Sequence, residues 1–158
     1  MRSRRLGAVG WLTVIANRSI PRSSVIPTLA YADVIEASRW LCDAFGFTER
    51  IRIGAHRVQL VLGDGAIVVT AFGDAADRGD AQGAWNGTHS VLVRVEDADR
   101  HYERAKRHGA RILRPPADFP YGERQYAAED IGGHRWTFSQ SIADVDPASW
   151  GGVAINIG

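Results

Sequence analysis

The sequence contains little cysteine, almost no net charge and no apolar run long enough to cross a membrane. Its single cysteine, Cys42, cannot form a disulfide within the chain, so we expect a reducing, cytoplasmic environment and a small buried thiol rather than a redox group. The net charge of +1 gives no electrostatic reason to expect nucleic acid or an anionic membrane as a partner. The apolar stretch near the start, residues 6–16, is too short to span a bilayer.

Residues 1–24 differ from the rest of the chain because they contain five arginines and no acidic residue. We expect them to form a loosely ordered N-terminal extension. A basic start before a short apolar run also resembles a secretory signal, so a targeting peptide is the alternative, although a clear cleavage site between small residues is missing.

The rest of the chain contains an internal duplication. With 158 residues, of which 45% are hydrophobic and 23% charged, the chain suits one domain or two fused half-domains. The order strand–helix–strand–strand–strand occurs over residues 25–72 and again over residues 88–140. Aligning Asp33 with Asp97, the expected N-caps of the two helices, and Gly65 with Gly133 superimposes the two halves. Residues 73–87 are expected to form a linker, and residues 141–158 a C-terminal tail.

In the first half, we expect strands over residues 25–32, 48–53, 56–62 and 66–72. Pro27 indicates that the first of these strands lies at a sheet edge, because proline cannot donate to a ladder of hydrogen bonds. A helix is predicted between Asp33 and Gly46, with apolar residues recurring on one face.

In the second half, we expect strands over residues 88–96, 110–113, 123–129 and 134–140, and a helix between Asp97 and Gly109. Residues 114–120, which contain three prolines, are expected to form a loop. Gly132 and Gly133 are expected to supply the positive φ of a tight hairpin. The predicted fold class is α+β: two β-α-β-β-β modules form a curved mixed sheet around a cleft, with the helices on its outer face.

Three segments of this duplication resemble the vicinal oxygen chelate superfamily, which includes glyoxalase I, extradiol dioxygenases, fosfomycin-resistance proteins and bleomycin-binding proteins. They are ASRWLCDAFGF at residues 37–47, HSVLVRVEDAD at residues 89–99 and YGERQYAAEDIGGHRWTF at residues 121–138. Ile131 stands where the family usually has a proline. The Arg-Trp pair after the double glycine is most similar to the bleomycin-resistance or PhnB-like branch.

The resemblance also implies where metal ligands would lie. Metal-dependent members place one ligand in the first strand and one in the last strand of each half. These positions correspond here to Val25 (or Ile26, with one residue of slack), Val69, His89 and Thr137. Only His89 is a competent ligand, whereas a catalytic metal needs about three protein ligands. We therefore expect no metal and no cofactor. Three other histidines are expected to have packing, solvated or turn roles: His101, His108 and His134.

The concave face of the sheet is the predicted ligand pocket, because strand alternation carries the former ligand positions to one side. His89 could hydrogen-bond a ligand, act as a general base, or be a core histidine. Strand 123–129 presents either Glu123 and Gln125 or Arg124 and Tyr126 to the pocket, and the sequence leaves both phases open. Trp136 and Phe138 are expected to pack under a helix. The predicted pocket residues are Val25, Gln59, Val69, His89, Val91, Val93, Tyr121, Gln125 and Thr137.

The function predicted from this pattern is metal-independent binding of a small hydrophobic, planar or amphipathic molecule by a cytoplasmic homodimer, with no nucleic acid or membrane as partner. One alternative is a metal-dependent lyase, isomerase or dioxygenase that uses His89 with ligands that the alignment misses. The other is a non-catalytic interaction module, with the concave face filled by its own side chains.

Overall fold

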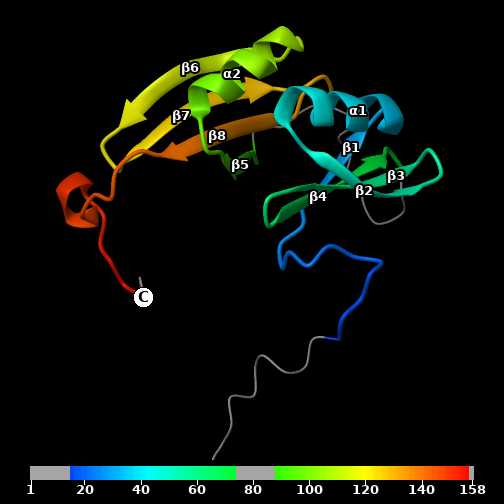
Figure 1. Cartoon of the computed structure of the whole chain (residues 1–158), viewed down its shortest axis with the longest axis horizontal. Coiled ribbons are helices and arrows are strands. Elements are labelled where there is room, and N and C mark those ends of the chain that lie inside the picture. Colours follow the sequence, from blue (N-terminus) through cyan, green and yellow to red (C-terminus); the bar gives the residue numbers. More distant parts are fainter. Residues whose placement is uncertain (1–14, 74–87, 157–158) are drawn as a thin grey trace, which may run out of the picture.

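The duplication predicted from the sequence is present in the computed structural model, which describes residues 15–73 and 88–156 (Figure 1). The first half contains β1 (Thr28–Tyr31), α1 (Val34–Phe45), β2 (Thr48–Ile53), β3 (Arg57–Leu62) and β4 (Gly65–Ala71). Its sheet has the order β1-β4-β3-β2, in which β1 is parallel to β4 and the other pairs are antiparallel. The expected edge position of the first strand is confirmed.

The second half repeats this arrangement. It contains β5 (Val91–Arg94), α2 (Ala98–Arg107), β6 (Arg111–Phe119), β7 (Glu123–Glu129) and β8 (Arg135–Ser141), and its sheet has the order β5-β8-β7-β6. A short 3-10 helix, η1 (Pro147–Trp150), follows in the tail. The α+β fold class with two β-α-β-β-β modules is therefore confirmed. Most of the predicted linker, residues 74–87, and residues 1–14 of the predicted extension lie outside the described residues.

Both helices begin at the predicted caps. The Asp33 carboxylate accepts a hydrogen bond from the backbone N–H of Glu36 at 2.9 Å, and Asp97 accepts one from the N–H of Arg100 at 3.0 Å. Each cap satisfies one of the N–H groups that the first turn of a helix leaves without an intrahelical partner. α1 ends at Gly46, as predicted. No helix among the described residues is both long and apolar enough to cross a membrane.

The prediction of a loop over residues 114–120 is wrong, because β6 runs through Pro115 and Pro116. Proline is tolerated here because β6 is the outermost strand of its sheet, where a missing N–H does not break a ladder. The pairing with β7 shifts register between Arg114 and Ala117, so the prolines occupy an irregularity in the strand.

The β7–β8 hairpin has a different geometry from the one predicted. Of the two adjacent glycines in this turn, Gly133 has a positive φ, at 84°, and Gly132 does not. Gly132 instead leaves room for an aromatic side chain, because a Cβ at this position would lie 2.5 Å from Cδ1 of Tyr31. One glycine therefore supplies the turn, and the other permits close contact between the two halves.

The core lies between the sheets and the helices, which Figure 1 shows side by side on one side of the sheets. Trp136 and Phe138 are fully buried in this core, as predicted from their position in the last strand. The two halves share one aromatic cluster, since Phe45 at the end of α1 packs edge-on against Trp136.

Side chains of α2 also hold the C-terminal end of α1. The Arg104 guanidinium donates to the carbonyl oxygens of Asp43 (2.6 Å) and Cys42 (3.0 Å). The Trp40 indole in turn donates to the carbonyl of His108 at 2.7 Å. The last carbonyls of a helix lack intrahelical donors and carry partial negative charge, so a guanidinium stabilises them on both counts.

Candidate functional site

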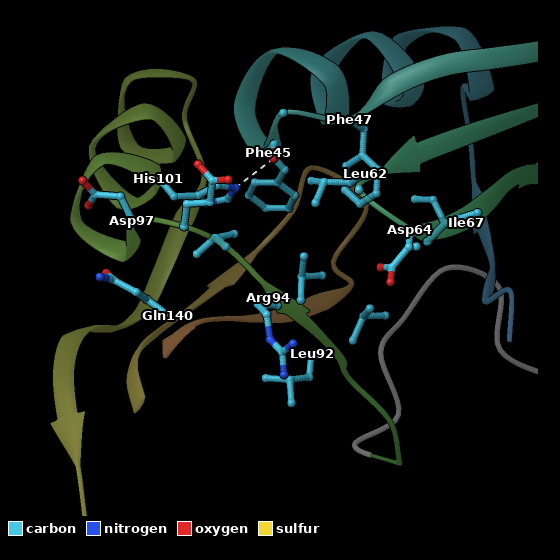
Figure 2. Close-up of a pocket in the computed structure, with 18 of the residues that line it drawn as sticks. Phe45, Phe47, Leu62, Asp64, Ile67, Leu92, Arg94, Asp97, His101 and Gln140 are labelled. Carbon is cyan, nitrogen blue, oxygen red and sulfur yellow. Dashed lines mark hydrogen bonds between the residues drawn. The ribbon is translucent and has the colours of Figure 1, made fainter. Parts of the chain in front are cut away.

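A cleft of about 1310 Å³ lies along β5, the edge strand of the second sheet (Figure 2). From the first half, the β3–β4 turn and the end of α1 line it. From the second half, β5 and one face of α2 line it. The cleft exists because β5 has a neighbour, β8, on one side only.

The interior of the cleft is apolar. Phe45 and Phe47, on either side of the turn that ends α1, contribute two rings, and Leu62 and Ile67 flank the β3–β4 turn. Phe45 is fully buried and Phe47 nearly so, so these rings support the floor from behind, and the half-buried Leu62, Val91 and Val93 supply accessible apolar surface. Such a floor suits the flat or aliphatic part of a small molecule.

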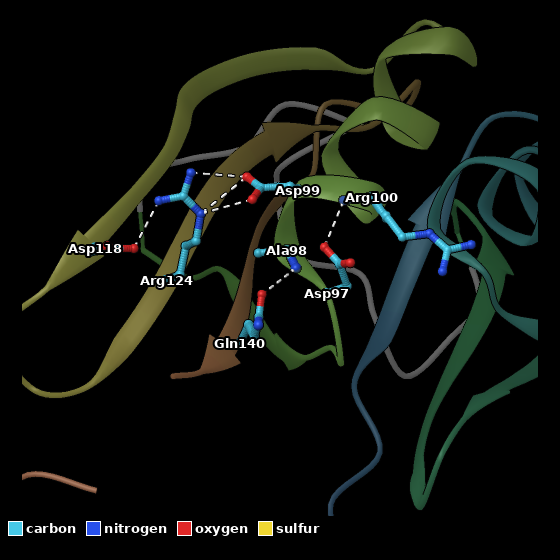
Figure 3. A network of polar contacts seen from close by, with 7 residues as sticks. All are labelled: Asp97, Ala98, Asp99, Arg100, Asp118, Arg124 and Gln140. Carbon is cyan, nitrogen blue, oxygen red and sulfur yellow. Dashed lines mark hydrogen bonds and ion pairs between the residues drawn. The ribbon is translucent and has the colours of Figure 1, made fainter. Parts of the chain in front are cut away.

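Charged groups stand around this floor. Four arginines line the cleft together with three acidic residues, and Figure 2 shows Arg94 and Leu92 projecting from the same side of β5. Gln140 also lines it, although its side-chain oxygen is already engaged by the N–H of Ala98 at 2.9 Å (Figure 3). The charged lining residues are Asp64, Arg94, Glu96, Asp97, Arg100, Arg104 and Arg107.

His101 connects the cleft to the core. Its Nε2 lies 2.8 Å from the carbonyl oxygen of Phe45, and its Nδ1 contacts the hydroxyl of Tyr126. Because a carbonyl only accepts, Nε2 carries the hydrogen, and in the neutral ring Nδ1 accepts from Tyr126. Burial lowers the pKa of His101, and the nearby Arg104 charge acts in the same direction, while the Phe45 hydrogen bond opposes it. Its packed role agrees with the prediction for this residue.

Several predicted pocket residues lie on the opposite face of their sheets from the one expected. Val69 is fully buried in the core under the helices, so its prediction as a concave-face residue is wrong. Val91 and Val93 also pack against that core, although both touch the cleft because β5 is an edge strand.

The face of Val69 was predicted wrongly because the two hairpins that were aligned differ in length. Leu29, four residues before the cap of α1, pairs with Val69; Val93, four residues before the cap of α2, pairs with Phe138. Phe138 is thus the counterpart of Val69, and Thr137 is the counterpart of Val68. Two residues join β3 to β4, whereas five join β7 to β8, so aligning Gly65 with Gly133 displaces the last strand by one.

The residues at the metal-ligand positions do not form a site that fits a metal ion. His89 and Val25 are exposed and Thr137 is half-buried, while Val68, which replaces Val69 after the correction, is an aliphatic residue. Imidazole from His89 remains the only strong donor of the four. Within residues 15–73 and 88–156, no group of three or more His, Cys, Asp or Glu side chains is arranged to hold a metal.

Of these positions, Val25 lines the cleft, but His89 and Thr137 do not. The His89 ring lies 6.5 Å from that of His134, which has its own structural role. Nε2 of His134 is 2.7 Å from the carbonyl of Ala30, so this histidine ties the β7–β8 turn to β1.

Gln59, a predicted pocket residue, lies outside the lining of the cleft, and the chain preceding β1 covers it. Its amide donates to the carbonyl of Ser19 at 2.7 Å, and its oxygen accepts from Arg50 at 2.5 Å. Arg50 also donates to the carbonyl of Arg18. The described part of the N-terminal extension therefore lies against the open face of the first sheet at this point.

The open phase of strand 123–129 is settled by contacts with α2. Tyr126 contacts His101, and Arg124 forms ion pairs with Asp99 and with Asp118 of β6 (Figure 3). Gln125 therefore points to the other face, where its amide donates to the Ser139 hydroxyl at 3.2 Å. Gln125 lies outside the lining of the cleft.

Tyr121 lies at the far end of the second sheet. It stacks on Phe119 and meets the ring of Trp150 edge-on at 5.6 Å. Tyr121 thus packs the tail onto the sheet. It was predicted to line the ligand pocket, but it is not among the residues that line the cleft.

A buried carboxylate that the sequence did not reveal joins the two halves. Oδ2 of Asp130 accepts from the Tyr31 hydroxyl at 2.5 Å and from the Trp136 indole at 2.9 Å. Oδ1 accepts from the backbone N–H groups of Gly132 (2.9 Å) and His134 (3.0 Å). The nearest signal in the sequence was the position of Asp130 at the start of the turn, which indicates only local hydrogen bonding.

Comparison with known proteins places this geometry among related structures. A family model described as the Glyoxalase/Bleomycin resistance protein/Dioxygenase superfamily matches residues 25–138. The crystal structure of TioX from Micromonospora sp. ML1 is 34% identical, with a TM-score of 0.64, and the match covers 75% of this chain and 98% of TioX. No functionally curated protein sequence matches this chain.

Two other solved structures share the fold at lower identity. A glyoxalase-related enzyme from Fulvimarina pelagi is 17% identical, with a TM-score of 0.62, and the match covers 75% of this chain and 88% of that one. A glyoxalase/bleomycin resistance protein/dioxygenase family enzyme from Burkholderia phytofirmans PsJN is 18% identical, with a TM-score of 0.58 and coverages of 72% and 94%.

Proposed function

This chain belongs to the glyoxalase/bleomycin resistance protein/dioxygenase superfamily, and on that basis we propose that it is a metal-independent protein that binds a small planar or amphipathic molecule. Proteins of this superfamily bind small molecules. The proposal places this chain in the bleomycin-resistance or PhnB-like branch, in which binding needs shape and charge complementarity but no bond-making group.

The cleft along β5 is the observation that carries this proposal. Pockets for small ligands typically have volumes of about 300–1,000 Å³ with an apolar lining and a few polar groups. The cleft, at about 1310 Å³, is larger than this range, and it combines the apolar side chains of Leu62, Val91 and Val93 with charged residues around them. The weak donor set at the metal-ligand positions supports binding without a metal.

We also propose that the protein is a cytoplasmic homodimer. Leu92 and Val25, which line the cleft, are 63% and 80% exposed, an unusual state for two aliphatic side chains that lie beside the same opening. A second copy placed over this edge would bury both side chains and reduce the open volume of the cleft.

A thermal-shift screen with planar compounds tests the binding function. A ligand that binds only the folded chain must raise the unfolding midpoint, by an amount that grows with ligand concentration. We expect stabilisation by at least one planar compound, and Phe47→Ala should reduce it. A screen in which no planar compound raises the midpoint would favour the non-catalytic interaction module.

Metal analysis of the purified protein tests the enzymatic alternative, a lyase, isomerase or dioxygenase that uses His89. This alternative requires about one transition metal per chain, lost in the His89→Ala variant. The binding proposal expects no such stoichiometric metal and unchanged ligand binding in His89→Ala, because His89 lies outside the cleft.

A further inference from the structure

Three arginines form a stripe on the face of α2 that lines the cleft. Arg100, Arg104 and Arg107 are spaced four and three residues apart, which places them on one side of a helix. The acidic residues of the same helix, Asp99 and Glu103, are not part of the lining. Asp99 instead pairs with Arg124 on β7. Three of the four cations of α2 therefore face the cleft, whereas Lys106 lies over the ring of Tyr102 and, like Asp99 and Glu103, outside the lining.

Arg104 has a structural partner, but Arg100 does not. The Arg104 guanidinium is occupied by the carbonyls at the end of α1. Arg100 is exposed, and among the described residues no carboxylate forms an ion pair with it. Figure 3 shows its side chain extending from the start of α2 toward the first half, away from the Arg124 network.

The position of Arg100 is also electrostatically unfavourable for the free protein. It is the third residue of α2, in the first helical turn, where the helix dipole is positive and disfavours a cation. The Asp97 carboxylate nearby is engaged by the N–H of Arg100 as the helix cap. An unpaired cation at this point has no stabilising role in the fold, and a bound anion would compensate for both disadvantages.

We propose that the ligand of the cleft is an aromatic carboxylate, with its flat body against the apolar lining that includes Leu62 and the edge of Phe47, and its acidic group against Arg100. This inference rests on the proposed binding function and adds the chemical class of the ligand. A guanidinium presents a planar pair of donors that matches a carboxylate, and pairing is strongest beside an apolar surface that excludes water.

The test compares naphthoate with naphthamide, which have the same ring system but differ in charge, by calorimetric titration of the full chain at low salt. We expect naphthoate to bind about tenfold more tightly, as one charge-assisted pair would give. Arg100→Gln should remove this preference and leave naphthamide binding unchanged, which also shows that the variant is folded. Arg39→Gln, an exposed arginine of α1 outside the cleft, is the matched control.

A second variant should change the affinity for naphthoate in the opposite direction. Glu96, an exposed lining residue just before α2, opposes an anion beside Arg100, so Glu96→Gln should tighten naphthoate binding a few-fold and leave naphthamide binding unchanged. If both probes bind equally and Arg100→Gln changes neither, the carboxylate inference is overturned while the binding function stands. If neither probe binds the unmodified chain, and the wider screen of planar compounds is also negative, both proposals fail.

Discussion

Replacing Asp130 by asparagine should destabilise the protein by about 3 kcal/mol, although the two side chains have nearly the same shape. The buried Asp130 carboxylate accepts four hydrogen bonds, two on each oxygen. An amide keeps one accepting oxygen and replaces the other with a donor. If the oxygen stays with the backbone N–H groups of the turn, the new NH₂ group faces the indole N–H of Trp136, and two donors oppose each other.

The magnitude follows from these contacts. A buried donor left without an acceptor, here Trp136, costs about 1–3 kcal/mol, and hydrogen bonds to a charged acceptor are stronger than those to a neutral one by about 1 kcal/mol. Tyr31 can rotate its hydroxyl and accept a hydrogen bond from the new amide, which limits the total loss of stability. Tyr31→Phe removes one donor and leaves the carboxylate three others, so it should cost only about 1 kcal/mol.

Urea unfolding of Asp130→Asn, of Tyr31→Phe and of the double variant measures these losses of unfolding free energy. Because both changes act on one network, the loss in the double variant should be smaller than the sum of the single losses. Asp144→Asn, at an exposed position in the tail, is the control and should lie within about 0.5 kcal/mol of the unmodified chain. A loss below about 1 kcal/mol for Asp130→Asn, or strictly additive losses, would refute the view that this carboxylate holds the two halves together.

Three further predictions concern titration and the tail. Burial raises the pKa of Tyr31 well above its ordinary value of about 10, and the Asp130 charge and hydrogen bond add to the effect. The stability that this residue contributes should be complete below about pH 10 and fall above it, and Tyr31→Phe should flatten that alkaline loss in urea titrations. The lowered pKa of His101 gives a pH dependence of the opposite sign, because the unfolded chain binds the proton more readily. Stability should fall as the pH drops below the ordinary histidine value of about 6.5, and His101→Gln should weaken this dependence. Gly122→Ala should release the tail, because Gly122 has a φ of 81° and a Cβ there would lie 2.1 Å from the carbonyl oxygen of Ala143. Limited proteolysis should then cleave the chain faster after residue 141. A cleavage rate equal to that of the unmodified chain would contradict the prediction.

Local patterns were sufficient to predict most elements of the fold. The caps at Asp33 and Asp97 were read correctly because a cap depends on residues within one helical turn. The strand through Pro115 and Pro116 was missed because its stability depends on its place at the outside of the sheet, which is a property of the assembled topology.

The site was predicted less well than the fold, and the reason is the two-residue period of a strand. Counting from Gly133 gave the correct strand, but counting from Gly65 gave Val69 as its counterpart in the first half instead of Val68. A shift of one residue turns a side chain from one face of a strand to the other. The network at Asp130 was invisible for another reason. Its partner Tyr31 lies 99 residues away in the sequence, and no local rule relates the two.

Replacing Val69 by Val68 at the metal-ligand position leaves the number of possible donors unchanged, since both are valines. Counterparts assigned from the strand register give Val25 and Val68 in the first half, and His89 and Thr137 in the second. The conclusion that the donors are too few thus does not depend on which alignment of the hairpins is used. The charged groups that line the cleft lie mainly on β5 and α2, in the half that also keeps His89. An exposed cation on an apolar wall can select a ligand by charge, and it can do so without the three converging donors that a metal requires.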